Sequence, residues 1–316
     1  MTHEAVTRGP DERVLGGVLP VFQTPYREDE SIDFGTLETE IDWLYEHDID
    51  GLVMGMASEL LRLGSEEREQ LAEHVCRSGR GRGVVVIGTG AESAYLAERY
   101  AKHAESVGAD AVMAIPPVST ALAEDELRGY YERIVAAITI PVIVQDASGY
   151  VGNPMPVELQ AKLLEDLGDR VMFKPEAEPT GPRLSALRDA TGGRARVFEG
   201  SGGIALADNY RRGIVGTMPG AEVIDGIVAL WRALEIGDEH RIYKLSLPIA
   251  SLVALQHGLD GSLTVEKYLL VKQGVFQNEI VRGPVGYALD QETRQEVDRL
   301  FEMVLEAIRE PHASRT

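Results

Sequence analysis

The sequence predicts a closed (βα)8 barrel followed by a C-terminal helical extension. Eight short apolar segments recur along the chain, and longer segments of helical pattern separate them. Such alternation is typical of parallel βα units. The 316 residues fit one large domain, and no break in composition divides them into two. An open, doubly wound sheet is the alternative that this pattern leaves.

The predicted strands are almost continuously apolar, as expected for strands that helices cover on both faces. They span residues 18–23, 51–56, 83–87, 111–115, 141–145, 171–174, 195–199 and 213–217. Because a barrel places its active site at the carboxyl ends of its strands, the residues that follow each segment are the candidates for chemistry.

Helical patterns lie between and after these strands. Residues 34–46 place Leu37, Ile41 and Leu44 on one face, and residues 91–106, 125–137 and 157–167 repeat that spacing. Residues 66–78 are also predicted to be helical, and residues 224–236 form the closing helix. Further helices are expected within 264–272 and 292–308. We therefore expect a barrel over residues 14–236 and helices packed on it over residues 237–310, as one structural unit.

Composition excludes several classes of protein. The net charge of −20 and the lack of a basic run argue against nucleic-acid binding. No uninterrupted apolar stretch reaches the ~18 residues of a membrane helix. Residues 1–13 are polar, without the apolar region of a secretory signal, so a cytoplasmic location is expected. With one cysteine, Cys76, and seven scattered histidines, we expect no metal and no cofactor.

Lys174 is the strongest candidate for catalysis. Of the six lysines, it alone ends an apolar strand, and the other five lie on polar or amphipathic helical stretches. Burial at the mouth of a barrel disfavours the charged ammonium, and the neutral amine can form a Schiff base. Glu176, two residues on, points the same way in an extended chain. The alternative is that Lys174 has no catalytic role and is a structural lysine paired with Glu176 or Glu199.

Glycine-rich turns supply further candidates. Residues 88–92 and 199–203 follow strands, and neither is a Walker loop or a dinucleotide fingerprint. Turns of this kind let the backbone approach a ligand, so Gly200 and Ser201 are predicted to bind substrate. Ser58, after the second strand, offers a hydroxyl for the same purpose.

The ordered set of motifs resembles the dihydrodipicolinate synthase/N-acetylneuraminate lyase superfamily. The similarity runs over residues 18–276 and includes Val18-Leu19-Pro20-Val21-Phe22-Gln23-Thr24-Pro25, Gly55-x-x-x-Glu59, Gly88-Thr89-Gly90, Ala114-Ile115-Pro116-Pro117, Phe173-Lys174-Pro175-Glu176 and Gly213-Ile214-Val215-Gly216. The resemblance implies a (βα)8 barrel, a Schiff-base lysine at Lys174, a small 2-oxo acid such as pyruvate as substrate, and a homo-oligomer, either a tetramer or a dimer.

Departures from the family's pattern are equally informative. Members that make dihydrodipicolinate carry two threonines where this chain has Met56 and Ala57, and a tyrosine where it has Gln145. The arginine that binds their second substrate also has no counterpart in the segment after Gln145. The name dihydrodipicolinate synthase would fit by similarity, but the residues do not support that activity.

The segment that begins at Gln145, together with Lys174-x-Glu176 and Met218-Pro219-Gly220, is more similar to the 2-keto-3-deoxy-L-arabonate dehydratases. The resemblance implies dehydration of a 2-keto-3-deoxy sugar acid, with Gln145 in the pocket and Ala57 and Met218 beside the substrate. Two alternatives stay open. One is a pyruvate-releasing class I aldolase, and the other is a barrel that binds a 2-oxo acid without turning it over.

Overall fold

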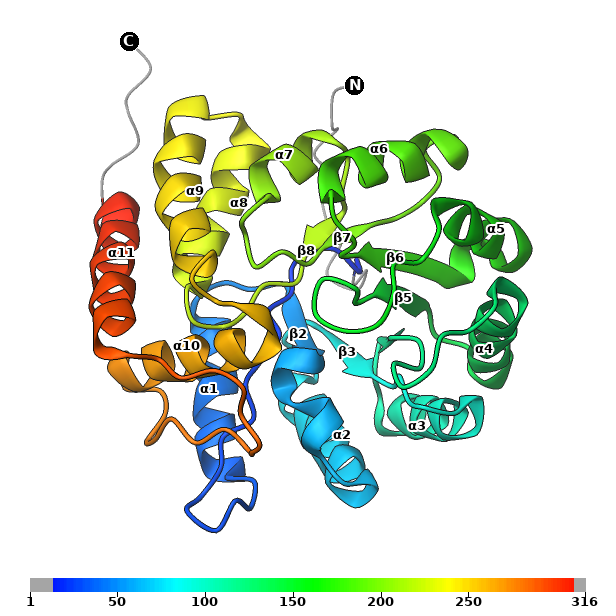
Figure 1. Ribbon diagram of the computed structural model, residues 1–316, viewed down its shortest axis with the longest axis horizontal. Helices are drawn as coiled ribbons and strands as arrows, with labels where there is room; N and C mark the ends of the chain where they lie inside the picture. Colours follow the sequence, from blue (N-terminus) through cyan, green and yellow to red (C-terminus); the bar gives the residue numbers. More distant parts are fainter. Residues whose placement is uncertain (1–13, 310–316) are drawn as a thin grey trace.

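The computed structural model describes residues 14–309 of the chain. The polar segment 1–13 and the final residue of the predicted extension, 310, lie outside this range. Strands gather at the centre of the molecule and helices surround them (Figure 1). The strands are β1 (Gly17–Val18), β2 (Gly51–Met54), β3 (Val84–Gly88), β4 (Ala111–Ala114), β5 (Val142–Asp146), β6 (Val171–Pro175), β7 (Phe198–Glu199) and β8 (Gly216–Thr217).

All strand pairs are parallel, and their order follows the sequence around a ring. One sheet runs β2-β3-β4-β5-β6, and a second runs β1-β8-β7. Single bridges join the two sheets at Val21–Val53 and Phe173–Val197. Because β8 pairs with β1 and these bridges connect the remaining neighbours, the strands form a barrel and not an open sheet. The predicted fold class is confirmed.

Several strands are shorter than predicted, most clearly the first. Residues 19–22 continue along the barrel: Leu19 N donates to Thr217 O at 2.9 Å and Val21 N to Pro219 O at 2.8 Å. Pro20 lies between them without an N–H group, so a regular ladder cannot continue through it. The predicted strand 18–23 is therefore reduced to β1 and a bridge at Val21.

Two apolar layers account for the continuous hydrophobicity of the strands. Met113, Ile143 and Met172 belong to one buried cluster, to which most of the strands contribute, so this cluster fills the barrel interior. Val112 and Val142, their neighbours along the chain, belong to a second cluster that includes the surrounding helices. Alternate residues of each strand thus face inward and outward, and both faces are buried.

The helices agree closely with the predicted segments. Residues 34–46, 157–167 and 224–236 are helical to the residue. The α-helices are α1 (Phe34–Glu46), α2 (Ser65–Gly79), α3 (Ala94–Val107), α4 (Glu124–Ala137), α5 (Val157–Leu167), α6 (Thr180–Ala190), α7 (Leu206–Arg211), α8 (Ile224–Ile236), α9 (Glu239–Val253), α10 (Gly258–Lys272) and α11 (Gln291–Arg309). None of the helices within residues 14–309 is long and apolar enough to cross a membrane.

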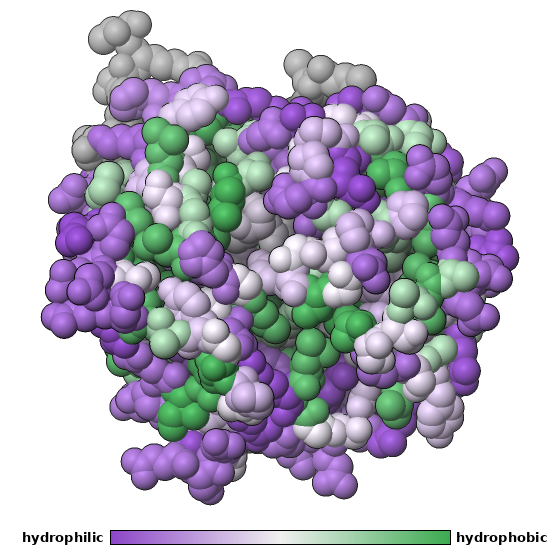
Figure 2. All heavy atoms as spheres, viewed as in Figure 1, coloured by the Kyte–Doolittle hydropathy of each residue, from purple (hydrophilic) through white to green (hydrophobic). Residues whose placement is uncertain are grey.

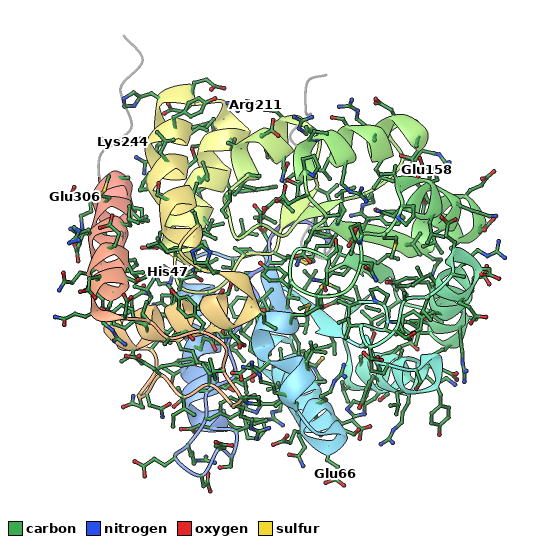
Figure 3. All side chains as sticks on the ribbon, in the orientation of Figure 1. His47, Glu66, Glu158, Arg211, Lys244 and Glu306 are labelled. Carbon is green, nitrogen blue, oxygen red and sulfur yellow. The ribbon has the colours of Figure 1, made fainter. Side chains whose placement is uncertain are left out.

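Charged side chains point outward from this helical layer. Glu66, Glu158 and Glu306 project from α2, α5 and α11 into solvent (Figure 3). The large negative charge of the chain is thus carried in part by exposed helix faces, where water solvates it. The acidic groups at the mouth of the barrel are buried instead, and they are the ones that bear on function.

A buried ion pair fastens α10 to the barrel. Lys267 is completely buried, although its sequence context indicates an amphipathic helix. Its Nζ lies 2.5 Å from Glu59 Oε1 and donates to the carbonyls of Thr24 at 2.8 Å and Ile280 at 2.6 Å. Lys174 is therefore not the only buried lysine, and α10 is held against the residues that follow β1 and β2.

Because the Lys267–Glu59 ion pair anchors α10 to the barrel, we expect Lys267→Ala to lower the free energy of unfolding strongly. The substitution removes the closest cation from the buried Glu59 carboxylate and leaves only Arg62, whose Nη1 lies 3.7 Å from Glu59 Oε2, and breaking such a buried pair costs about 3–5 kcal/mol. Lys272→Ala is the matched control, because Lys272 on the same helix pairs with Asp298 at the surface, where such pairs contribute about 0–1 kcal/mol. Urea denaturation of both variants measures the free energy of unfolding. Equal losses would contradict the assigned role of the buried pair.

Candidate active site

Lys174 occupies the carboxyl end of β6, inside the barrel mouth. Its Cα is in register with that of Gln145 on β5, so the two side chains leave neighbouring strands at the same level. The lysine is 4% exposed, and its Nζ donates to Glu176 Oε1 at 2.8 Å. The predicted burial of Lys174 is observed, and Glu176, one of the two expected partners, is its counter-ion.

Glu176 links the lysine to Gln145. Its Oε1 accepts from Lys174, and its Oε2 accepts from the Gln145 Nε2 at 2.7 Å. The backbone N of Glu176 donates to Asp146 O at 2.9 Å, which extends the β5–β6 pairing past Pro175 and fixes the carboxylate. Burial raises the pKa of Glu176, while the charge and hydrogen bond of Lys174 and the hydrogen bond of Gln145 act in the opposite direction. A carboxyl group in hydrogen-bond contact with an amine is placed to exchange a proton with it.

Gly200 permits the close approach of the chain after β7. A Cβ at this position would stand 2.6 Å from Glu176 Oε1 and 2.8 Å from Lys174 Nζ. Real Cβ atoms do not come so near, so any side chain at residue 200 would displace the amine or the carboxylate. Gly200 was predicted to bind substrate through the backbone of its turn, and what the structure shows is that it leaves space beside Lys174 and Glu176.

A cavity opens above these groups. It contains about 520 Å³ of space, a volume that includes its opening to solvent. Gln145, Lys174, Glu176, Gly200, Ala57 and Met218 all line it, so the structure brings six of the eight predicted site residues together. Part of the wall comes from outside the strands, from Gln256 and from α10 through Leu259, Ser262 and Glu266. On the face that Figure 2 presents, apolar and weakly polar residues gather toward the centre, within a largely hydrophilic rim.

The two predicted serines do not line this cavity. Ser58 is fully buried: its hydroxyl donates to Phe22 O at 2.7 Å and accepts from Gly55 N at 3.1 Å. Ser201 donates its hydroxyl to Glu199 Oε1 and accepts from Ala205 N at 3.0 Å. Both hydroxyls satisfy the protein's own polar groups and shape the turns that surround the site.

Glu199, the other expected partner of Lys174, is engaged elsewhere. Its Oε2 accepts from the Thr217 hydroxyl at 2.6 Å, and its Oε1 accepts from Ser201 N at 2.5 Å. Its charge nevertheless reaches the site, since it contributes to the raised pKa of Glu176. Within residues 14–309, no group of three or more His, Cys, Asp or Glu side chains is placed to hold a metal ion.

The sequence analysis missed several cavity residues, among them Tyr150 and Glu266. Tyr150 lies on the loop after β5 and reaches the cavity because Asp146 accepts backbone N–H groups from Ser148 and Met155, which folds the loop back. Glu266 lies on α10, three residues after Leu263 and four before Leu270, both buried. That spacing predicts that Glu266 shares the buried face of its helix. The helical repeat is therefore the sequence signal that could have identified Glu266.

Comparison with known proteins connects this geometry to one family. Residues 14–304 match the dihydrodipicolinate synthetase family. The chain belongs to this family. It is accordingly a lyase, and the family predicted from the motifs is confirmed. Enzymes named as dehydratases and as aldolases both occur among the proteins similar to it.

Three similar proteins illustrate the range of the family. L-2-keto-3-deoxyarabonate dehydratase of Azospirillum brasilense is 27% identical over 289 residues, which cover 89% of this chain and 92% of that protein. The structure of dihydrodipicolinate synthase from Rhodopseudomonas palustris superimposes with a TM-score of 0.82 at 25% identity, covering 91% of this chain and 97% of that one. Sialic acid aldolase of Ruminococcus gnavus shares the fold, with a TM-score of 0.81 at 20% identity over 92% of this chain and 97% of the other.

Gly200→Ala should disable the site while leaving the barrel folded. The added Cβ would collide with Lys174 and Glu176, so we expect at least a tenfold loss in the rate of borohydride trapping of pyruvate. Gly129→Ala is the matched control, because a Cβ at that helical glycine meets nothing within 4 Å. Mass spectrometry after reduction measures trapping. Normal trapping in Gly200→Ala would show that the amine does not need this space.

Proposed function

We propose that this lyase dehydrates a 2-keto-3-deoxy sugar acid through a Schiff base on Lys174. The observation that carries the proposal is the Glu176 carboxylate, which contacts both the Lys174 amine and the Gln145 amide within one buried cavity. A nucleophile and a proton-transferring group in direct hydrogen-bond contact are the parts that covalent catalysis on a carbonyl requires.

Proton transfer within the ion pair prepares the nucleophile. Movement of one proton from Lys174 Nζ to Glu176 Oε1, across 2.8 Å, leaves a neutral amine. Only the neutral amine has the free electron pair that a nucleophile needs. The amine then attacks the C2 carbonyl of the substrate, and loss of water from the adduct gives an iminium ion.

The iminium ion acidifies the hydrogen atoms at C3. Glu176, once again a carboxylate, removes a C3 proton, and the electron pair forms an enamine with Lys174. The enamine then expels the C4 hydroxyl as water, and hydrolysis of the remaining imine frees the lysine. Gln145 holds the second oxygen of Glu176 and orients the carboxylate, but an amide has no pKa near neutrality and relays no proton.

Retro-aldol cleavage uses the same iminium ion and is the second candidate function. It would break the C3–C4 bond and release pyruvate. The similarity to the dehydratase of Azospirillum brasilense favours water loss. We also expect a homo-oligomer, as a tetramer or a dimer, and a cytoplasmic location.

Turnover of a panel of 2-keto-3-deoxy sugar acids tests this proposal, with Lys174→Ala as the decisive variant. We expect the wild type to lose water from at least one substrate, and the variant to lose all measurable turnover because no amine remains. Borohydride with substrate should add mass to the wild type only. Lys162→Ala, which removes an exposed helical lysine, serves as the control. Pyruvate release without dehydration, or trapping at another lysine, would contradict the proposal.

Glu176 and Gln145 should differ in the size of their effects. Glu176→Gln removes the base and should lower kcat by roughly 10²–10⁴-fold, the usual loss for a general acid–base group. Gln145→Ala removes one buried hydrogen bond, worth about 1–3 kcal/mol, and should act on substrate orientation. Steady-state kinetics on the best substrate compares them. A near-normal kcat in Glu176→Gln beside an inactive Gln145→Ala would reverse the two assignments.

A further inference from the structure

A second group of carboxylates borders the same cavity, away from Lys174. Glu266 of α10 lies on the cavity wall, and Glu222, between β8 and α8, does not line the cavity but approaches Glu266 at Gly220. Both are almost completely buried, at 4% and 2% exposure. Their carboxylates meet over Gly220: a Cβ at that glycine would stand 2.3 Å from Glu222 Oε2 and 2.7 Å from Glu266 Oε1.

Neither carboxylate forms an ion pair among the described residues, although the charge of Lys267 acts to lower the pKa of Glu266. Lys267 is adjacent in sequence, but its three N–H donors are taken by Glu59, Thr24 O and Ile280 O. The groups that do contact the pair are neutral amides: Gln23 donates to Glu266 Oε2, and Gln256 donates to Glu222 Oε1 at 2.8 Å.

Two buried carboxyl groups so close together cannot both ionise. Burial raises the pKa of Glu266 well above its usual range, and the charge of Glu222 raises it further. Burial also raises the pKa of Glu222. Both shifts favour a proton held between the two groups, and carboxyl groups that interact this closely titrate as a pair. Glu222 Oε2, which has no hydrogen-bond partner of its own among the described residues, faces Glu266 and can share that proton.

The protonated pair and the Lys174–Glu176 pair face one cavity from different sides. The charges of both pairs act on Tyr150. Burial raises the pKa of its phenol, and the negative charges of Glu176 and Glu266 raise it further. Its phenol thus stays protonated within electrostatic reach of the two carboxyl groups. Lys174 and Glu266 line the same cavity, so a role for Glu266 requires that the C4 hydroxyl of a substrate joined to Lys174 through C2 reaches the part of the cavity that Glu266 lines.

We propose that Glu266, which shares a proton with Glu222, is the general acid that protonates the leaving C4 hydroxyl. This inference rests on the proposed dehydration and assigns its second proton transfer. As the C4–O bond breaks, the enamine electrons form the C3–C4 double bond, and the Glu266 proton joins the departing oxygen to make water. Glu176 then holds the former C3 proton and Glu266 is a carboxylate. Return of one proton from Glu176 to Glu266 through the cavity restores both groups.

A reaction without a leaving group distinguishes the role of Glu266 as an acid from the role of Glu176 as a base. Exchange of the pyruvate C3 hydrogens in D2O requires the imine on Lys174 and a base, but no acid at C4. Glu266→Gln should therefore lower kcat for dehydration by roughly 10²–10⁴-fold, while pyruvate exchange, followed by proton NMR, stays within threefold of the wild type. Glu176→Gln should lose both reactions.

Glu40→Gln is the matched control. Glu40 is another buried carboxyl group near this cluster, and its pKa is raised to about 8 by burial, but it does not line the cavity. Its Oε1 accepts from Gln23 N at 2.9 Å, a bond that the amide oxygen of glutamine can replace. We expect both reactions in Glu40→Gln to stay within threefold of the wild type.

The outcomes distinguish the two proposals. If the wild type exchanges pyruvate hydrogens but dehydrates no 2-keto-3-deoxy acid, the proposed function fails and the role of Glu266 fails with it. If the wild type dehydrates its substrate and Glu266→Gln keeps a near-normal kcat, even with a raised KM, only the role of Glu266 is overturned. Loss of pyruvate exchange in Glu266→Gln would also overturn it, because the residue would then support the whole site.

Discussion

Parallel pairing around a closed ring is the constraint on which this molecule depends. Because all strands run in one direction, their carboxyl ends open on one mouth, and the side chains that follow them converge there. Lys174 and Gln145 are brought together by backbone register alone, since their Cα atoms are paired between β5 and β6. The chemistry of the site thus follows from hydrogen bonds between peptide groups and needs no bound ion to assemble it.

Electrostatic balance distinguishes the two sides of the cavity. On one side, Glu176 has the Lys174 ammonium as a partner, and the pair can redistribute one proton internally. On the other side, Glu222 and Glu266 have only amide donors, so they stay partly protonated. A substrate held between them meets a base at one end and an acid at the other. Elimination of water needs this polarity, because one carbon must lose a proton while its neighbour's oxygen gains one.

Features that follow from a regular repeat along a strand or a helix could be predicted from the sequence. The barrel, most helix boundaries and the shared face of Lys174 and Glu176 follow from alternation along strands and from the helical repeat. The orientation of Tyr150 does not, because it depends on backbone hydrogen bonds to Asp146 that fold an irregular loop. The serines mislead for a related reason: a hydroxyl near a site is equally suited to a ligand and to a nearby carbonyl. Periodicity places Glu266 on a buried face, but it does not say what that face contacts.

The α10 helix carries the structural anchor and the proposed acid on consecutive residues. Successive side chains on a helix are about 100° apart, so Lys267 reaches the barrel wall while Glu266 reaches the cavity. Any shift of α10 that moves one of them also moves the other. Changes in substrate range are therefore most easily accommodated at Ser262 and Leu259, which line the cavity about one and two turns before Glu266. We therefore expect substitutions that change the substrate range of this lyase to occur near the start of α10.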